Sequence, residues 1–158
     1  MTVNVVRSMP AYVWNTNHRM WKVVPPFADS LAVLKAYITD ASAYVYWSTP
    51  RLFDEIAVGD IAYILCTVDH QGIVARGRVA EAPRLLNAGN AGAFAQPARL
   101  TPPGWDEVVA PSSWKTGIAI EATFWDAPVN RAMRPAQGAV ARLSEEEVAR
   151  IEGEIGRR

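Results

Sequence analysis

The sequence has 158 residues, enough for one domain with a substantial hydrophobic core and too few for two domains of usual size. Charged residues make up 20% of the chain and hydrophobic residues 50%, a balance that excludes a disordered tail or a collagen-like segment. The 16 basic and 16 acidic residues leave no net charge, which argues against strong binding to long duplexes by counterion release, so we expect one domain over residues 1–158 whose affinity for any nucleic acid comes from a local site.

The first elements are short and are separated by turn-forming residues. Residues 11–15 alternate weakly and lead into Asn-Thr-Asn, which predicts a strand followed by a turn. Asp29 or Ser30 can cap a helix over residues 29–39, because the apolar side chains of this segment fall near helical spacing. Residues 44–47 are aromatic and predict a short strand that Ser-Thr-Pro interrupts.

The middle of the chain indicates a hairpin. Residues 51–58 predict a short helix or turn, and the Gly-Asp pair at 59–60 predicts a tight turn. An apolar strand over 61–68 and an alternating strand over 72–80 follow, joined by a turn of the Asp-His-Gln-Gly type. These two strands are therefore expected to pair.

The last part of the chain combines a long loop with two clear elements. Residues 83–115 are rich in Pro and Gly and predict a long ordered loop with one helical turn, a type of loop that is commonly functional. Residues 117–125 alternate as a strand does, and Ser144 with Glu147 forms a capping box that opens a helix over 145–155. Because strands and helices do not alternate regularly, we expect an α+β fold with a mixed β-barrel of five to six strands and flanking helices.

Several residue types bear on compartment and chemistry. Cys66 lies inside an apolar run and is interpreted as a buried hydrophobe, consistent with a reducing cytoplasm. The uncharged run 41–50 is too short to cross a bilayer, and no signal-peptide pattern opens the chain, so we expect a cytoplasmic protein without targeting. His18 and His70 stand alone in the sequence, which predicts no metal site and no cofactor.

Six tryptophans in a chain of this length are more than a core requires. Trp14, Trp47 and Trp105 have polar or turn-forming neighbours, a context typical of tryptophans that line clefts, where the ring supplies stacking area and the indole N–H finds a partner. Trp14 is nevertheless assigned to the core rather than to a cleft.

One segment resembles a known family. Residues 46–50, Tyr-Trp-Ser-Thr-Pro, followed by the helix-like stretch 51–56 and by Gly-Asp-Ile-Ala-Tyr at 59–63, resemble the pattern of EVE and YTH domains of the PUA-like superfamily. Further segments agree with that pattern in order, namely residues 13–17, 72–79 and 137–140. The resemblance is closest to EVE domains and implies a PUA-like barrel that holds a modified base, extruded from its strand, in an aromatic cage.

The resemblance also implies roles for individual residues. Trp47 would be one wall of the cage, and Ser48 and Thr49 would offer backbone and hydroxyl groups to the base edge. Asn15 can present both a donor and an acceptor to a Watson–Crick edge. Structural alternatives stay open: Trp47 can be a core residue, Ser48-Thr49-Pro50 a helix cap, and Asn15 a turn bridge.

The opposite wall follows from the same resemblance, whereas the rim rests on the arginines in the middle of the chain. Trp21 or Trp105 is the candidate for the second wall, since the sequence does not align unambiguously there. The segment 134–137 lacks the acidic residue expected of YTH-like sequences, which leaves the identity of the base open. If the ligand is a polynucleotide, phosphate contacts on its rim are expected from Arg76, Arg78 and Arg84. Alternatively, Arg76 and Arg78 form a solvated strand face.

Two other classes of function compete with a reader of modified bases, either methylated or hydroxymethylated, in DNA or RNA. Asp54, Glu55 and Asp60 can supply paired carboxylates, but they flank turns without a nearby histidine, so we expect no enzyme. The alternative is a small-ligand or peptide-binding module that uses the same aromatic cleft. For a base reader, the partners are modified DNA or RNA and a separately encoded nuclease or other effector, and no membrane.

Overall fold

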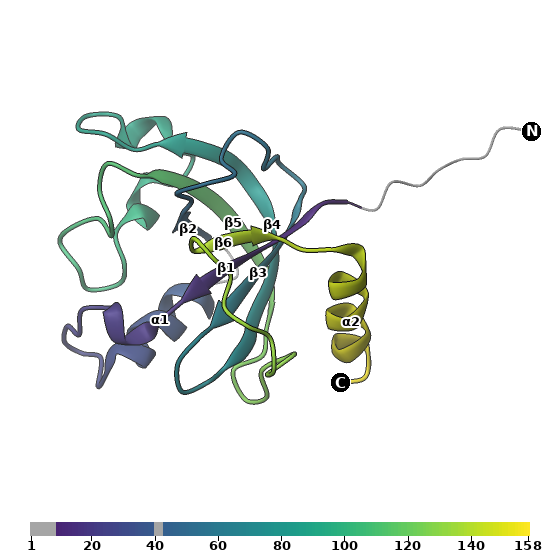
Figure 1. The fold of residues 1–158 in the computed structure, drawn as a ribbon. Helices are drawn as coiled ribbons and strands as arrows, with labels where there is room; N and C mark the ends of the chain where they lie inside the picture. The colour runs from purple at the N-terminus through teal and green to yellow at the C-terminus, as the bar shows by residue number, and fades with distance from the viewer. Residues whose placement is uncertain (1–8, 40–42) are drawn as a thin grey trace, which may run out of the picture.

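The computed structural model describes residues 9–39 and 43–158, which form six β-strands, two α-helices and three short 3₁₀-helices (Figure 1). The strands are β1 (Ala11–Thr16), β2 (Tyr44–Ser48), β3 (Ile61–Cys66), β4 (Gly72–Leu85), β5 (Trp114–Thr123) and β6 (Val140–Arg142). The helices are α1 (Ser30–Thr39), α2 (Glu145–Gly156), η1 (His18–Met20), η2 (Ala91–Ala93) and η3 (Pro97–Leu100). No helix among these residues is long and apolar enough to cross a membrane.

All six strands belong to one sheet, in the order β2-β5-β4-β3-β1-β6. The pair β1 and β3 is parallel, and the other four pairs are antiparallel. This mixed sheet of six strands with two flanking helices confirms the predicted α+β class and strand number, and it is consistent with the barrel that the resemblance implies.

Strand β1 separates two hydrophobic layers because successive side chains of a strand point to opposite faces. Tyr12 and Trp14 are buried on one face, in the core that Trp47 shares. Ala11 and Val13 are buried on the other face, in the cluster that includes Ile151 of α2. Trp14 is fully buried, as the sequence analysis expected.

Two tryptophan side chains join β1 to β2, although these strands are not neighbours in the sheet. The indole N–H of Trp14 donates to Thr49 Oγ1 at 3.3 Å, and the indole N–H of Trp47 donates to the carbonyl of Asn15 at 3.2 Å. We call these two hydrogen bonds the β1–β2 seam. The seam brings the ends of the two strands together beside the pocket described below.

Both predicted α-helices are confirmed together with their caps. Asp29 Oδ1 accepts from the amide of Ala32 at 2.8 Å and caps α1. Ser144 and Glu147 form the expected capping box at the start of α2. The lone Cys66 is buried, and burial raises the pKa of its thiol, as suits a structural rather than a nucleophilic cysteine.

Other boundaries differ from the prediction. Residues 51–58 form turns, one of the two alternatives predicted for them, whereas β4 continues to Leu85 instead of ending at 80. The strand tolerates Pro83 because its register against β5 shifts between Glu81 and Arg84, where a missing N–H breaks no regular ladder. The first residues of the loop predicted over 83–115 therefore belong to β4, and its last residues belong to β5. The short strand β6 was not predicted.

Candidate ligand-binding site

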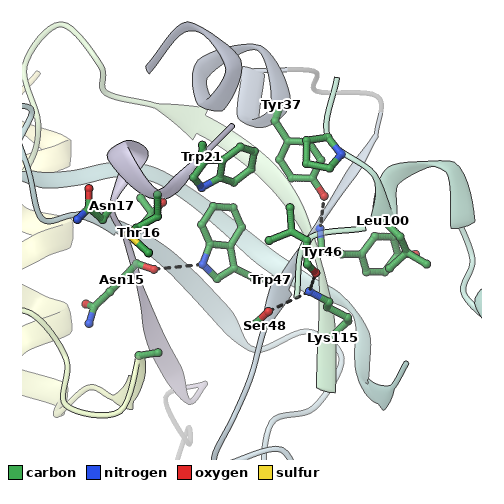
Figure 2. Close-up of a pocket in the computed structure, with 14 residues that line it drawn as sticks. Asn15, Thr16, Asn17, Trp21, Tyr37, Tyr46, Trp47, Ser48, Leu100 and Lys115 are labelled. Atoms are coloured by element: carbon green, nitrogen blue, oxygen red, sulfur yellow. Dashed lines mark hydrogen bonds between the residues drawn. The ribbon is translucent and has the colours of Figure 1, made fainter. Parts of the chain in front are cut away.

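A pocket of about 190 Å³ opens where β1 and β2 end and β5 begins (Figure 2). Four aromatic rings line it, those of Trp21, Tyr37, Tyr46 and Trp47. The volume is below the ~300–1,000 Å³ of most small-molecule sites, which suits a ligand of about one ring system. The residues that line it and that the sequence analysis did not place in a site are Thr16, Asn17, Met20, Tyr37, Tyr46, Leu100, Pro102, Val109, Lys115 and Ala139.

The two central rings are Trp21 and Trp47. Trp47 is 9% exposed and is held by the seam, whereas Trp21 is partly buried in the segment after η1. The ring centroids lie 6.0 Å apart, with an angle of 33° between the planes. Trp21 also contacts Tyr37, with centroids 5.5 Å apart, and Trp105, with centroids 5.9 Å apart. Trp47 is thus the fixed wall of the pocket and Trp21 the outer wall.

A buried lysine lies beside these rings. The side chain of Lys115 donates to Ser48 Oγ at 2.9 Å and to the carbonyl of Val109, and the residue is only 2% exposed. Burial lowers the pKa of its amine to about 8. Within the described part of the chain, no carboxylate forms an ion pair with it. Lys115 was not predicted as a site residue, because nothing in the local sequence distinguishes it from a solvated lysine next to a loop.

A second polar group of the pocket wall has no partner. Thr16 is 4% exposed, and its Oγ1 makes no hydrogen bond with any residue that the structure describes. Buried hydroxyl groups are nearly always paired, and the Oγ1 of Thr16 is an exception that is itself buried in the pocket wall. In Figure 2, Thr16 and Lys115 lie on opposite sides of the Trp47 ring.

Four of the six predicted ligand-binding residues line the pocket. One of these, Asn15, uses its side-chain amide to bind the backbone of another segment. Its Nδ2 donates to the carbonyl of Ala136 at 2.7 Å, and its Oδ1 accepts from the amide of the same residue at 2.9 Å. Figure 2 shows this amide pointing away from Trp47. The expectation that Asn15 reads a base edge is therefore corrected, because a turn occupies its acceptor and one donor.

Thr49 and Trp105 do not line the pocket. Thr49 is fully buried, and its hydroxyl lies in hydrogen bonds with Trp14, with the Trp47 carbonyl and with Thr116. Its hydroxyl thus serves the core rather than a base edge. Trp105 touches the ring of Trp21 from outside the lining, and its indole donates to the Lys22 carbonyl at 3.0 Å.

The predicted rim arginines lie outside the pocket lining as well. Arg76 pairs with Glu152 of α2 at 2.7 Å, and Arg78 pairs with Glu121 of β5 at 3.3 Å. The guanidinium of Arg84 lies 5.8 Å from the ring centroid of Phe94. Carboxylates compensate the first two charges, so these arginines are poorly placed to attract phosphates to the pocket.

Arg51 is the cation at the pocket edge. Its Nη1 donates to the carbonyl of Gln137 at 3.1 Å, and its stem packs so close to Gly138 that a Cβ there would lie 2.7 Å from it. The next residue, Ala139, lines the pocket. Arg51 is exposed and has no ion pair with any described carboxylate, so its charge is available to a ligand at this edge.

His18 forms a separate polar cluster that anchors η1. Its Nε2 lies 2.6 Å from Asp69 Oδ2 and its Nδ1 lies 3.0 Å from Ser30 Oγ, which ties η1 to the β3–β4 turn and to α1. The bond with His18, together with Arg19, holds the pKa of Asp69 below its usual value. No group of three or more side chains able to hold a metal ion occurs among the residues described.

Comparison with known proteins finds solved structures of similar fold but assigns no family. No family model and no curated protein matches the sequence. The structure is similar to that of a Pseudomonas putida protein, with a TM-score of 0.54, 10% identity and coverage of 90% of this chain and 97% of that one. It is also similar to a hypothetical protein from Leishmania major, with a TM-score of 0.52, 13% identity and coverage of 96% and 98%.

The comparison with solved structures also matches human THYN1 in complex with 5-methylcytosine containing DNA, with a TM-score of 0.48, 8% identity and coverage of 88% of this chain and 93% of that one. At such low identities, the likeness to the Pseudomonas and Leishmania proteins shows a shared fold and nothing about ligands.

Proposed function

We propose that this chain is an EVE-like binding module that holds one planar modified base, extruded from a DNA or RNA strand, against Trp47. The observation that carries the proposal is the ring-sized pocket whose wall is made by Tyr46, Trp47 and Ser48, the same residues that carry the sequence resemblance. The aromatic rings of the lining stack on the base, and the polar groups at the ends of the pocket orient it by hydrogen bonding.

The energetics favour a base that is already easy to extrude. Stacking on aromatic side chains is worth about 1–3 kcal/mol per base, and extrusion from a duplex costs a few kcal/mol. The free energy of stacking on one face of the base therefore roughly offsets the cost of extrusion, and stacking on the second face gives net binding. Single strands and mismatched sites are the preferred substrates for this reason.

Enclosure on both faces requires a small rearrangement. A ring held between two indoles needs a wall separation of roughly 7 Å, twice the contact distance of carbon atoms. Trp21 and Trp47 are 6.0 Å apart and inclined by 33°, so one wall must move outward by about 1 Å and rotate. Trp21 is the wall that moves, because Trp47 is fixed by its bond to β1.

The proposal is a binding role rather than catalysis. The residues that line the pocket include no carboxylate and no histidine, the groups that most often transfer protons in active sites. The carboxylates that the sequence offered, Asp54, Glu55 and Asp60, are not among the lining residues.

The alternative of a small-ligand module has one observation in its favour. Ion pairs compensate Arg76 and Arg78, and Arg51 is the cation that lies beside the lining. A polynucleotide needs several phosphate contacts to position it, whereas a free nucleobase or nucleoside needs none.

The test is a tryptophan-fluorescence titration at fixed salt with short single-stranded DNA and RNA that carry one modified base, each beside its unmodified twin and the matching free nucleoside. We expect at least tenfold tighter binding of one modified oligonucleotide, which corresponds to ~1.4 kcal/mol. Trp47→Ala should abolish the preference, whereas Trp114→Ala, which removes a ring that stacks on Phe53 outside the lining, should keep it.

The outcomes separate the two candidates. Preference for a modified oligonucleotide over its free nucleoside supports the base reader. Equal affinity for the nucleoside and the oligonucleotide supports the small-ligand module. If no modified ring binds better than its unmodified twin, the base-reader proposal is wrong.

A further inference from the structure

We propose that Lys115 and Ser48 form a subsite for a carboxylate on the edge of the bound ring, so that the pocket prefers a carboxyl-bearing base, such as 5-carboxylcytosine, to a methylated one. This inference rests on the proposed function, because it names the substituent that the same pocket selects. Three observations carry it: a buried cation without a counter-ion, a hydroxyl with a free proton, and an unpaired hydroxyl across the ring.

The first observation is the state of Lys115. An ammonium group has three N–H donors, and two of them go to Ser48 Oγ and the Val109 carbonyl. The residue is 2% exposed, and no described carboxylate forms an ion pair with it. Buried charges are normally paired, and one without a partner is costly. The missing counter-charge is therefore what a ligand can provide.

The second observation concerns Ser48. Its Oγ accepts a hydrogen bond from Lys115, so the hydroxyl proton of Ser48 is free to be donated. Two donors thus lie side by side in the lining of the pocket. A carboxylate has two oxygens and accepts from both, and charge-assisted bonds of this kind are about twice as strong as neutral ones.

The third observation is Thr16, whose buried hydroxyl is unpaired on the other side of the Trp47 ring (Figure 2). A base stacked on Trp47 would face Thr16 with one edge and Lys115 with the opposite edge. A methyl group in place of the carboxylate would leave the ammonium unpaired, and a neutral carbonyl would accept one bond without neutralising the charge.

The subsite predicts a specific pH dependence. The amine binds an anion only when protonated, so affinity is full below its pKa of about 8 and falls as the pH rises through that value. If the carboxylate holds the proton in the complex, binding at pH 9 is about tenfold weaker than at pH 7.

Other ionisable groups around Lys115 do not produce this effect. The pKa of Tyr37 on α1 is raised to about 12 and that of Tyr46 on β2 is raised further, chiefly by burial, so both stay neutral in this range. The neighbouring strand β4 carries Glu81 and Arg84, and the loop before β5 carries Glu107.

The experiment compares short single-stranded oligonucleotides that carry one 5-carboxylcytosine, one 5-methylcytosine or cytosine, at pH 7, 8 and 9 and constant ionic strength. We expect the carboxylated strand to bind at least tenfold tighter than the methylated strand at pH 7 and to lose about tenfold by pH 9. The methylated strand should change less than threefold. Calorimetry at pH 8 in two buffers of different ionisation enthalpy should show proton uptake for the carboxylated strand.

A phosphate could supply the same negative charge, and a separate arm distinguishes it. The carboxylated nucleoside, which has no phosphate, should compete with the carboxylated strand, whereas cytidine monophosphate should not. If the monophosphate competes as well as the carboxylated nucleoside, Lys115 binds phosphate and the proposal is overturned.

The variant Lys115→Met keeps the length of the stem and removes the charge. It should lose the preference for the carboxylate and its pH dependence, so that the carboxylated and methylated strands bind with similar affinity. Ser48→Ala should lose part of the preference. Should Lys115→Met fail to fold, the pH series and the competition arm on the unaltered protein still decide the matter.

The failures are distinguishable. If the methylated strand beats cytosine in a Trp47-dependent manner but the carboxylated strand binds no tighter, or its affinity is unchanged to pH 9, the subsite is wrong and the base-binding role stands. If no modified strand binds better than cytosine, the proposed function fails together with the subsite.

Discussion

Replacing Trp21 by alanine separates the contribution of the outer wall from the stability of the fold. The Trp21 ring contacts Trp47, Tyr37 and Trp105, and it is the wall that must move when a base enters. Trp21→Ala removes this wall and leaves Trp47 with its hydrogen bond to β1. Binding should therefore suffer more than folding.

The expected magnitude follows from one stacked face. Losing a base–aromatic contact costs about 1–3 kcal/mol, which is a loss of about 5- to 140-fold in affinity. The loss of unfolding free energy should be smaller than the ~3–5 kcal/mol typical of a buried tryptophan, because Trp21 is only partly buried.

Urea denaturation gives the stability of the variant, and fluorescence titration with the preferred oligonucleotide gives its affinity. The matched control is Trp105→Ala, which removes a ring 5.9 Å from Trp21 that does not line the pocket, and which should change affinity less than about threefold. Full affinity in Trp21→Ala, or an equal loss in Trp105→Ala, would refute the two-walled pocket.

Three further outcomes are expected. Trp47→Phe keeps a ring but loses the indole bond to β1, so urea denaturation should show a loss of unfolding free energy of about 1 kcal/mol, against ~3–5 kcal/mol for Trp47→Ala. Unchanged stability in Trp47→Phe would show that the seam bond contributes nothing. Arg51→Ala should weaken the binding of modified and unmodified single strands alike and reduce the slope of log affinity against log salt by ~0.7 in titrations at several salt concentrations. Because Arg78 is already ion-paired, Arg78→Ala should leave the affinity and the slope unchanged. The hydrogen bond with His18 lowers the pKa of Asp69, so the stability that the Asp69 carboxylate contributes is present above the ordinary carboxyl pKa and is lost as the pH falls through the lowered value. Asp69→Asn should therefore lose less stability than the unaltered protein below about pH 4, as measured by acid denaturation followed by circular dichroism. Identical acid transitions of the two proteins would contradict this.

The sequence was informative where the determining interactions are local. The bond between Ser144 and Glu147 spans three residues, and it placed the start of α2 correctly. The aromatic segment 44–47 likewise predicted a strand, and the motif within it placed Trp47 beside a pocket. Each of these features depends on neighbours in the chain.

The polar groups of the pocket depend instead on contacts between distant segments. Lys115 is buried because β5 pairs it with Ser48 of β2, which turns both side chains to the same face. The hydroxyl of Thr49 turns inward because Thr116 and the Trp14 indole lie there. A sequence pattern cannot tell a lysine beside a loop from a lysine buried between strands.

The β1–β2 seam links occupancy of the pocket to the dynamics of an edge strand. Among the residues described, side chains rather than a backbone ladder join these two strands, so a local opening of the barrel between them breaks no ladder hydrogen bond. A ligand that packs on Trp47 must raise the free energy of that opening, because Trp47 belongs to the seam as well as to the pocket. Deuterium exchange at the amides of β2 should therefore slow when the pocket fills, even at residues that the ligand does not touch.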